Sequence, residues 1–139
     1  MRFLDAVTPR EGDGPSKYIR KQFLGLQDIM GDDWQTAYTF SEALQIRGDQ
    51  QTKVRVLTRS SELIWPPDLA PTAPRMPERF AGIAGIHTLI DTDASYSTGS
   101  EAAQEFDEKV ILDRLLSLKV DIRDAFNAVV TETALKDWA

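Results

Sequence analysis

The sequence contains no cysteine and a single histidine, His87, and these absences exclude several kinds of site. Without thiols the chain forms neither a disulfide framework nor a thiolate zinc centre, and it has no cysteine nucleophile. No serine or threonine belongs to a nucleophile motif that includes His87. We therefore predict no catalytic residue, no bound metal and no cofactor.

Long apolar runs and glycine-rich phosphate loops are also missing. No stretch approaches the ~20 apolar residues that span a bilayer, and residues 1–5 lack the apolar run of a secretory signal. We expect no membrane association and a cytoplasmic location. No glycine-rich loop follows a predicted strand, which argues against a doubly wound nucleotide-binding fold.

The charge balance disfavours nucleic acid as a partner. The chain has a net charge of −6, and residues 61–139 hold fourteen of its 22 acidic side chains. A phosphate backbone would be repelled by that acidic part, so binding would require a local basic patch. The basic residues for such a patch are Lys17, Arg20, Lys21, Arg47, Lys53 and Arg55.

Hydrophobic residues make up 42% and charged residues 27% of the 139 residues, which predicts one folded domain spanning 1–139. Alternating patterns predict strands over 2–7, 36–47, 53–59 and 80–96, with a hairpin turn at Gly48-Asp49. A short helix over 16–23 should bury Tyr18, Ile19 and Phe23. Five prolines make residues 64–79 a loop.

The alternation of apolar and polar residues also indicates which face of a strand is expected in the core. In the segment 36–47, apolar residues on one side alternate with polar residues on the other, which predicts a half-buried strand. The apolar side carries Tyr38, Phe40, Leu44 and Ile46. In the segment 80–96, the side with Ile86, Ile90 and Ala94 is the better core face, with His87, Leu89, Asp91 and Asp93 opposite.

The C-terminal segment carries the strongest periodicity, with apolar residues spaced by three and four positions. The spacing predicts a helix from about residue 102 to 130, with Ser100 near its start, and then a short helix capped by Thr131. The stripe is Ile111, Leu115, Leu118, Ile122, Phe126 and Val129. The predicted fold is α+β: an antiparallel sheet of about four strands, with a short N-terminal helix and the long helix packed on one face.

Three stretches resemble the C-terminal half of a sporadically distributed, functionally uncharacterised family of bacterial and archaeal proteins. They are Arg2–Val7, Leu89–Asp93, and a closing helix with Leu118, Ile122, Phe126, Val130 and Thr131. Lys119 departs from the histidine expected after the leucine. The resemblance implies a half-length, split or truncated relative whose uncovered sheet edge associates with another chain, and its patchy distribution points to mobile or defence-associated genes.

Charged and polar residues on two predicted strands are candidates for binding a ligand. His87, Asp91 and Asp93 lie on one predicted strand face, and Lys53, Arg55 and Arg59 on another. If these strands are neighbours, the cations should pair with the aspartates across them. As an alternative use, His87, Asp91, Asp93, Arg55 and Tyr38 would line a pocket between the sheet and the long helix, in a small-molecule-binding protein or enzyme.

Trp65, Pro66 and Pro67 in the proline loop, and Trp138 near the C-terminus, are candidates for contacting a partner. Each aromatic side chain has a second use, since Trp65 can pack over the domain and Trp138 can anchor the chain end. A good core pattern without recognisable chemistry favours a noncatalytic interaction or accessory protein. Such a protein would act through self-association or a partner chain.

Overall fold

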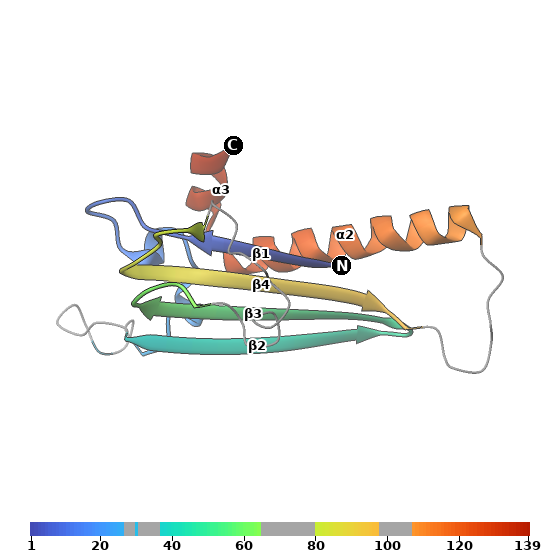
Figure 1. The fold of residues 1–139 in the computed structure, drawn as a ribbon, viewed down its shortest axis with the longest axis horizontal. Helices are drawn as coiled ribbons and strands as arrows, with labels where there is room; N and C mark the ends of the chain where they lie inside the picture. The colour runs from blue at the N-terminus through green and yellow to red at the C-terminus, as the bar shows by residue number, and fades with distance from the viewer. Residues whose placement is uncertain (27–29, 31–36, 65–79, 98–106) are drawn as a thin grey trace.

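Four alternating segments form an antiparallel sheet with the strand order β1-β4-β3-β2 (Figure 1). The computed structural model describes residues 1–26, 30, 37–64, 80–97 and 107–139. The strands are β1 (Arg2–Val7), β2 (Tyr38–Arg47), β3 (Gln50–Ser60) and β4 (Ile86–Tyr96). The predicted α+β class, with an antiparallel sheet and a long C-terminal helix on one face, is confirmed. The predicted hairpin is also confirmed, because β2 pairs with β3 through a turn at Gly48 and Asp49.

Two helices close the chain, α2 (Glu108–Val129) and α3 (Glu132–Trp138). Asp107 caps α2, because its carboxylate accepts hydrogen bonds from the backbone N–H groups of Lys109 at 2.9 Å and Val110 at 3.1 Å. Thr131 caps α3 as predicted. The helix start predicted near residue 102, with Ser100 before it, lies outside the described residues, as does most of the proline loop.

The prediction of one continuous N-terminal helix is wrong. Two separate 3₁₀ turns, η1 (Pro15–Lys17) and η2 (Lys21–Phe23), occupy its place. Between them, Ile19 forms an isolated antiparallel bridge with Val130, and the Arg20 N–H donates to the Val129 carbonyl at 2.9 Å. Pairing with the end of α2 therefore overrides the local helix propensity.

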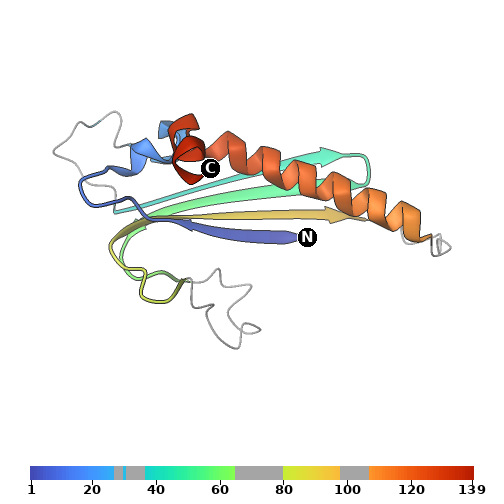
Figure 2. The same cartoon turned by 90° about the horizontal axis from the view of Figure 1, so that it is seen from above.

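The core lies between the sheet and α2, which packs on β4 and β3. Figure 2 shows α2 and α3 on the same side of the sheet. Leu118 and Ile122 of α2 cluster with Ala94 of β4. The main cluster joins residues of the sheet, the N-terminal turns and both helices: Val7, Tyr18, Ile19, Leu24, Val56, Ile90, Val129, Val130 and Ala134. The expected core face of β4 is confirmed.

The first turns of α2 extend past the ends of the strands (Figures 1 and 2). The Arg114 guanidinium lies 4.4 Å from the ring centroid of Tyr96, the last residue of β4. Before that point the sheet offers no surface, so Ile111 and the nearby Leu115 are exposed although they belong to the predicted stripe. Only the second half of the stripe is buried.

Trp138 anchors the C-terminal helix. Its ring stacks on Tyr18, with centroids 6.1 Å apart and planes 9° from parallel, and it also contacts Phe126. The side chain remains partly exposed. Trp65, Pro66 and Pro67 lie outside the described residues.

Within the described parts of the chain, no helix combines the length and apolar character that a bilayer crossing requires.

Candidate interaction surface

The sheet face turned away from α2, here called the outer face, carries all five residues predicted to bind a ligand. Directly opposed residues in an antiparallel pair point to the same face. Arg55 is opposed to Asp91 and Arg59 to His87, whereas Ile90 between them lies in the core beneath α2. The outer face therefore contains Tyr38, Arg55, His87, Asp91 and Asp93, and none of them lines the space between the sheet and α2.

Four charged side chains, one from each strand, form a row across the outer face that we call the charged belt: Arg2, Asp91, Arg55 and Glu42. Arg2 donates from Nε and Nη2 to the two carboxylate oxygens of Asp91, at 2.7 and 2.6 Å. Arg55 donates from Nη1 to Asp91 at 3.3 Å and from Nε to Glu42 at 2.7 Å. The predicted pairing of cations with aspartates across the strands is confirmed for Arg55 and Asp91.

The ion pairs of the charged belt serve to hold the sheet together. Asp91 is only 3% exposed, so its charge requires compensation, which the two guanidinium groups provide. The hydrogen bond from Arg55 also holds the pKa of the Glu42 carboxyl below its usual range. Asp91 and Arg55 thus hold β1, β4, β3 and β2 in register. Asp93 is half-buried, directly opposite Arg2 and Lys53 in the neighbouring strands.

His87 is completely buried on the outer face. Its Nδ1 lies 3.0 Å from the Gly85 carbonyl, whereas its Nε2 and the Nε of Arg59 have no hydrogen-bond partner among the described residues. Burial lowers the pKa of the imidazole, and the nearby Arg59 charge adds to the effect. The described residues hold no group of three or more His, Asp or Glu side chains placed to bind a metal ion.

The outer face of β2 carries an exposed apolar row, which we call the edge stripe: Tyr38, Phe40, Leu44 and Ile46. Their exposed fractions are 61%, 52%, 51% and 68%, so the prediction that β2 is a half-buried strand with its apolar side covered is wrong. The opposite side of β2, towards α2, presents small or polar residues such as Thr39, Ser41 and Ala43. The stripe faces away from α2, and apolar alternation could not reveal on which side of the sheet the helix packs.

The strand β2 also lies at one edge of the sheet. β2 is at the end of the strand order, and among the described residues only β3 pairs with it. The strand is ten residues long and contains neither proline nor lysine, two common protections of an edge strand. Peptide groups that pair with no other described strand therefore lie along the same edge as the apolar stripe.

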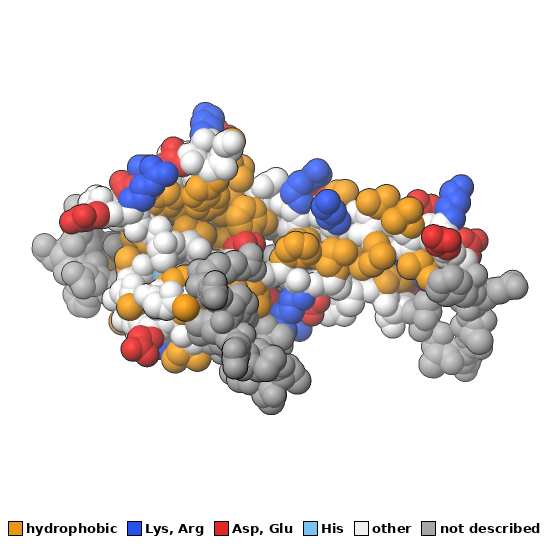
Figure 3. Space-filling view, turned by 45° about the horizontal axis from the view of Figure 1, so that its top comes forward, with side chains coloured by type: hydrophobic (Ala, Val, Ile, Leu, Met, Phe, Trp, Pro, Cys, Tyr) orange, Lys and Arg blue, Asp and Glu red, His pale blue; other side chains and the backbone are white. Residues whose placement is uncertain are grey.

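A second exposed apolar surface lies on the first half of α2. Figure 3 shows hydrophobic side chains, in orange, following the part of the helix at the right of the view. The largest exposed members are Val110, Ile111, Leu112, Leu115, Leu116 and Val120. Unlike β2, this surface offers no unpaired peptide groups, because the helix satisfies its own backbone.

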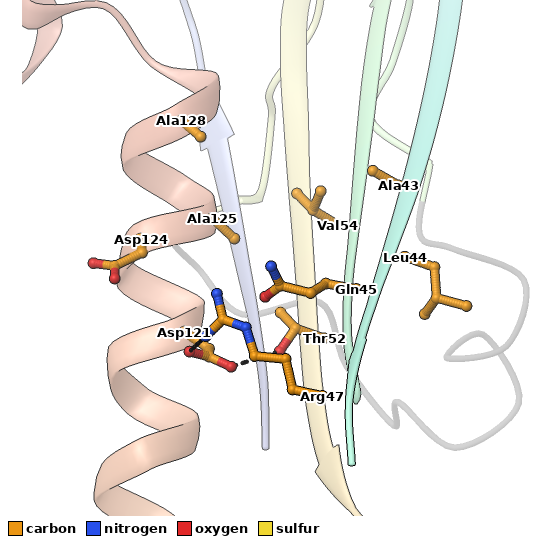
Figure 4. A pocket seen from close by; sticks show the side chains of 10 residues that line it. All are labelled: Ala43, Leu44, Gln45, Arg47, Thr52, Val54, Asp121, Asp124, Ala125 and Ala128. Carbon is orange, nitrogen blue, oxygen red and sulfur yellow. Dashed lines mark hydrogen bonds and ion pairs between the residues drawn. The ribbon is translucent and has the colours of Figure 1, made fainter. Parts of the chain in front are cut away.

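A groove of ≈ 290 Å³ lies between α2 and the β2–β3 hairpin (Figure 4). Asp121 of α2 points into it and accepts hydrogen bonds from Gln50 at 2.5 Å, Thr52 at 3.2 Å and Arg47 at 3.3 Å. Its carboxylate thus joins the helix to the hairpin and is already occupied. The five predicted ligand residues do not line this groove.

Replacement of Asp91 by Asn should destabilise the protein by about 1–3 kcal/mol, because two partly exposed guanidinium groups would lose their shared counter-ion. Urea unfolding measures the loss. Glu42→Gln, on the exposed end of the belt, is the matched control and should cost much less. Equal losses for the two variants would contradict the central role of Asp91.

Lowering the pH from about 7.5 to 5.5 should reduce the free energy of unfolding. The buried His87 has a depressed pKa, so below about pH 6.5 the unfolded chain binds a proton that the folded chain does not, at a limiting slope of about 1.4 kcal/mol per pH unit. Denaturant unfolding at several pH values measures this slope. His87→Asn should flatten it, whereas the control Phe3→Asn should retain it, and an unchanged slope in His87→Asn would refute the assignment.

Comparisons with protein-family models, curated proteins and solved structures find no match to this chain. The resemblance described from the sequence therefore stays a prediction.

Proposed function

We propose that this chain is a noncatalytic protein-interaction module that binds another protein chain along the outer edge of β2. The observation that carries the proposal is the edge stripe, four large apolar side chains exposed beside a strand edge that no other described strand pairs with. Burial of apolar surface contributes a favourable free energy of roughly 25 cal/mol per Å², so a partner that covers the stripe is stabilised.

Strand addition suits this edge. A partner strand laid beside β2 would satisfy the outward peptide groups and bring its own side chains against the stripe. Soluble proteins rarely leave a long, regular and apolar edge strand open, since such an edge pairs readily with other chains. The absence of proline and lysine from β2 fits an edge kept for pairing.

The alternative of a small-molecule-binding protein or enzyme has less support. Its predicted lining residues lie on the outer face, where Asp91 and Arg55 are engaged in the charged belt. The groove beside α2 has a different lining, and the Asp121 carboxylate in it already accepts hydrogen bonds from the hairpin. The family resemblance, if correct, adds no reaction and is compatible with a partner chain.

The double substitution Phe40→Lys with Leu44→Lys should abolish association without unfolding the chain. Loss of two apolar contacts at an interface centre weakens binding by at least about 30-fold. Sedimentation equilibrium of the purified chain and capture of partners from the source organism's lysate measure the effect. Circular dichroism verifies that the variant folds.

Matched controls replace exposed apolar residues elsewhere. Phe3→Lys lies on the other edge strand, β1, and Leu112→Lys on the first half of α2. Both should retain the association of the parent chain. If the parent associates with nothing, or if only Leu112→Lys disrupts its association, the proposed role of β2 is wrong.

A further inference from the structure

We infer that the partner of the edge stripe is a second copy of this chain, paired antiparallel through β2 to form a continuous eight-stranded sheet. The inference rests on the proposed function and names its partner. A two-fold axis would pass beside Glu42, the midpoint of the stripe. Such an interface uses the same patch on both copies, so the patch must be complementary to itself.

The outer-face sequence of β2 meets this requirement because it is a palindrome in chemical character. Two large apolar residues, Tyr38 and Phe40, precede Glu42, and two more, Leu44 and Ile46, follow it at the same spacing. Antiparallel pairing about Glu42 opposes Phe40 to Leu44 of the second copy, and Tyr38 to its Ile46. Aromatic and aliphatic residues opposed in this way stabilise a sheet.

The two neighbouring registers of the strand pairing are energetically less favourable. Faces are preserved only if the pairing slips by an even number of residues, and the smallest such slips oppose Glu42 either to Phe40 or to Leu44 of the second copy. Each would bury a carboxylate against an apolar side chain twice in the symmetric dimer. The register centred on Glu42 is the one that matches apolar residues throughout the stripe.

The central register brings the two Glu42 carboxylates together, and the charged belt offsets their repulsion. Arg55 donates to Glu42 at 2.7 Å within each chain, so the row across the dimer reads Arg55, Glu42, Glu42, Arg55. On the side towards α2, the same register opposes Ser41 to Ala43 and Thr39 to Gln45. These side chains are small or uncharged and place no charge against an apolar group.

The resulting assembly would close at two copies. Its outermost strands would be the two β1 edges, which are six residues long and carry Arg2 and Asp5. A short, charged edge disfavours further strand addition. The two-fold contact consumes both β2 edges, so no filament can grow through them.

Site-directed cysteines test the register, since the natural chain has no thiol. In the proposed dimer the two positions 42 are directly opposed, with Cβ atoms about 5 Å apart, whereas two positions 40 are about 14 Å apart. A short thiol-specific cross-linker should therefore join Glu42→Cys to itself at least tenfold faster than Phe40→Cys to itself. Light scattering should show a dimer for the parent chain.

A mixture gives a second measurement that does not disturb Glu42. Phe40→Cys mixed with Leu44→Cys should cross-link, because these positions are opposed across the interface, whereas each variant alone should remain largely uncross-linked. Leu112→Cys on α2 is the control for a helix-mediated dimer. Circular dichroism verifies that each variant is folded.

A monomeric parent chain, preferential cross-linking of Leu112→Cys, or a mixture no more reactive than its components would each overturn the inference. If the parent is monomeric but captures another protein in a manner that Phe40→Lys with Leu44→Lys abolishes, the second copy is excluded and the proposed function stands. If neither self-association nor stripe-dependent capture is found, both are wrong.

Discussion

The antiparallel pairing of β4 with both β1 and β3 is the constraint on which the rest of the structure depends. It directs Ile90 and Ala94 towards α2, and it directs His87 and Asp91 to the outer face. A carboxylate buried within a sheet requires counter-ions, and the neighbouring strands provide them through Arg2 and Arg55. One register thus determines both the apolar core and the charged belt.

On the sheet face towards α2, the width of the helix determines which strands it covers. A helix with its side chains is about 10 Å wide and strands lie about 4.8 Å apart, so α2 spans about two strands of the four. Its main packing partners are β4 and β3, and β2 lies beyond them at the edge of the sheet. The residues of β2 are distributed accordingly, with small or polar side chains towards α2 and the edge stripe on the outer face. Packing within the chain does not explain that stripe.

Local sequence patterns were enough to predict the four strands, the hairpin, the long helix and the Thr131 cap, because each depends on neighbouring residues. The fourth strand was predicted to begin at residue 80, which is wrong, since β4 begins at Ile86. Pairing of Arg55 with Asp91 also followed from alternation. The position of the edge stripe did not, since alternation separates Tyr38 from Thr39 but does not say which side is covered. The 3₁₀ turns were missed for a related reason: the bridge between Ile19 and Val130 joins residues far apart in the sequence.

Hydrogen exchange of the β2 amides at low and high protein concentration tests the central claim most directly. Outward amides of the edge strand are open to water in a monomer and hydrogen-bonded in a β2-paired dimer. The account predicts that alternate amides between Tyr38 and Arg47 become protected as the concentration rises, while those of β1 do not change. Exchange of β2 that is equally fast at every concentration would contradict it.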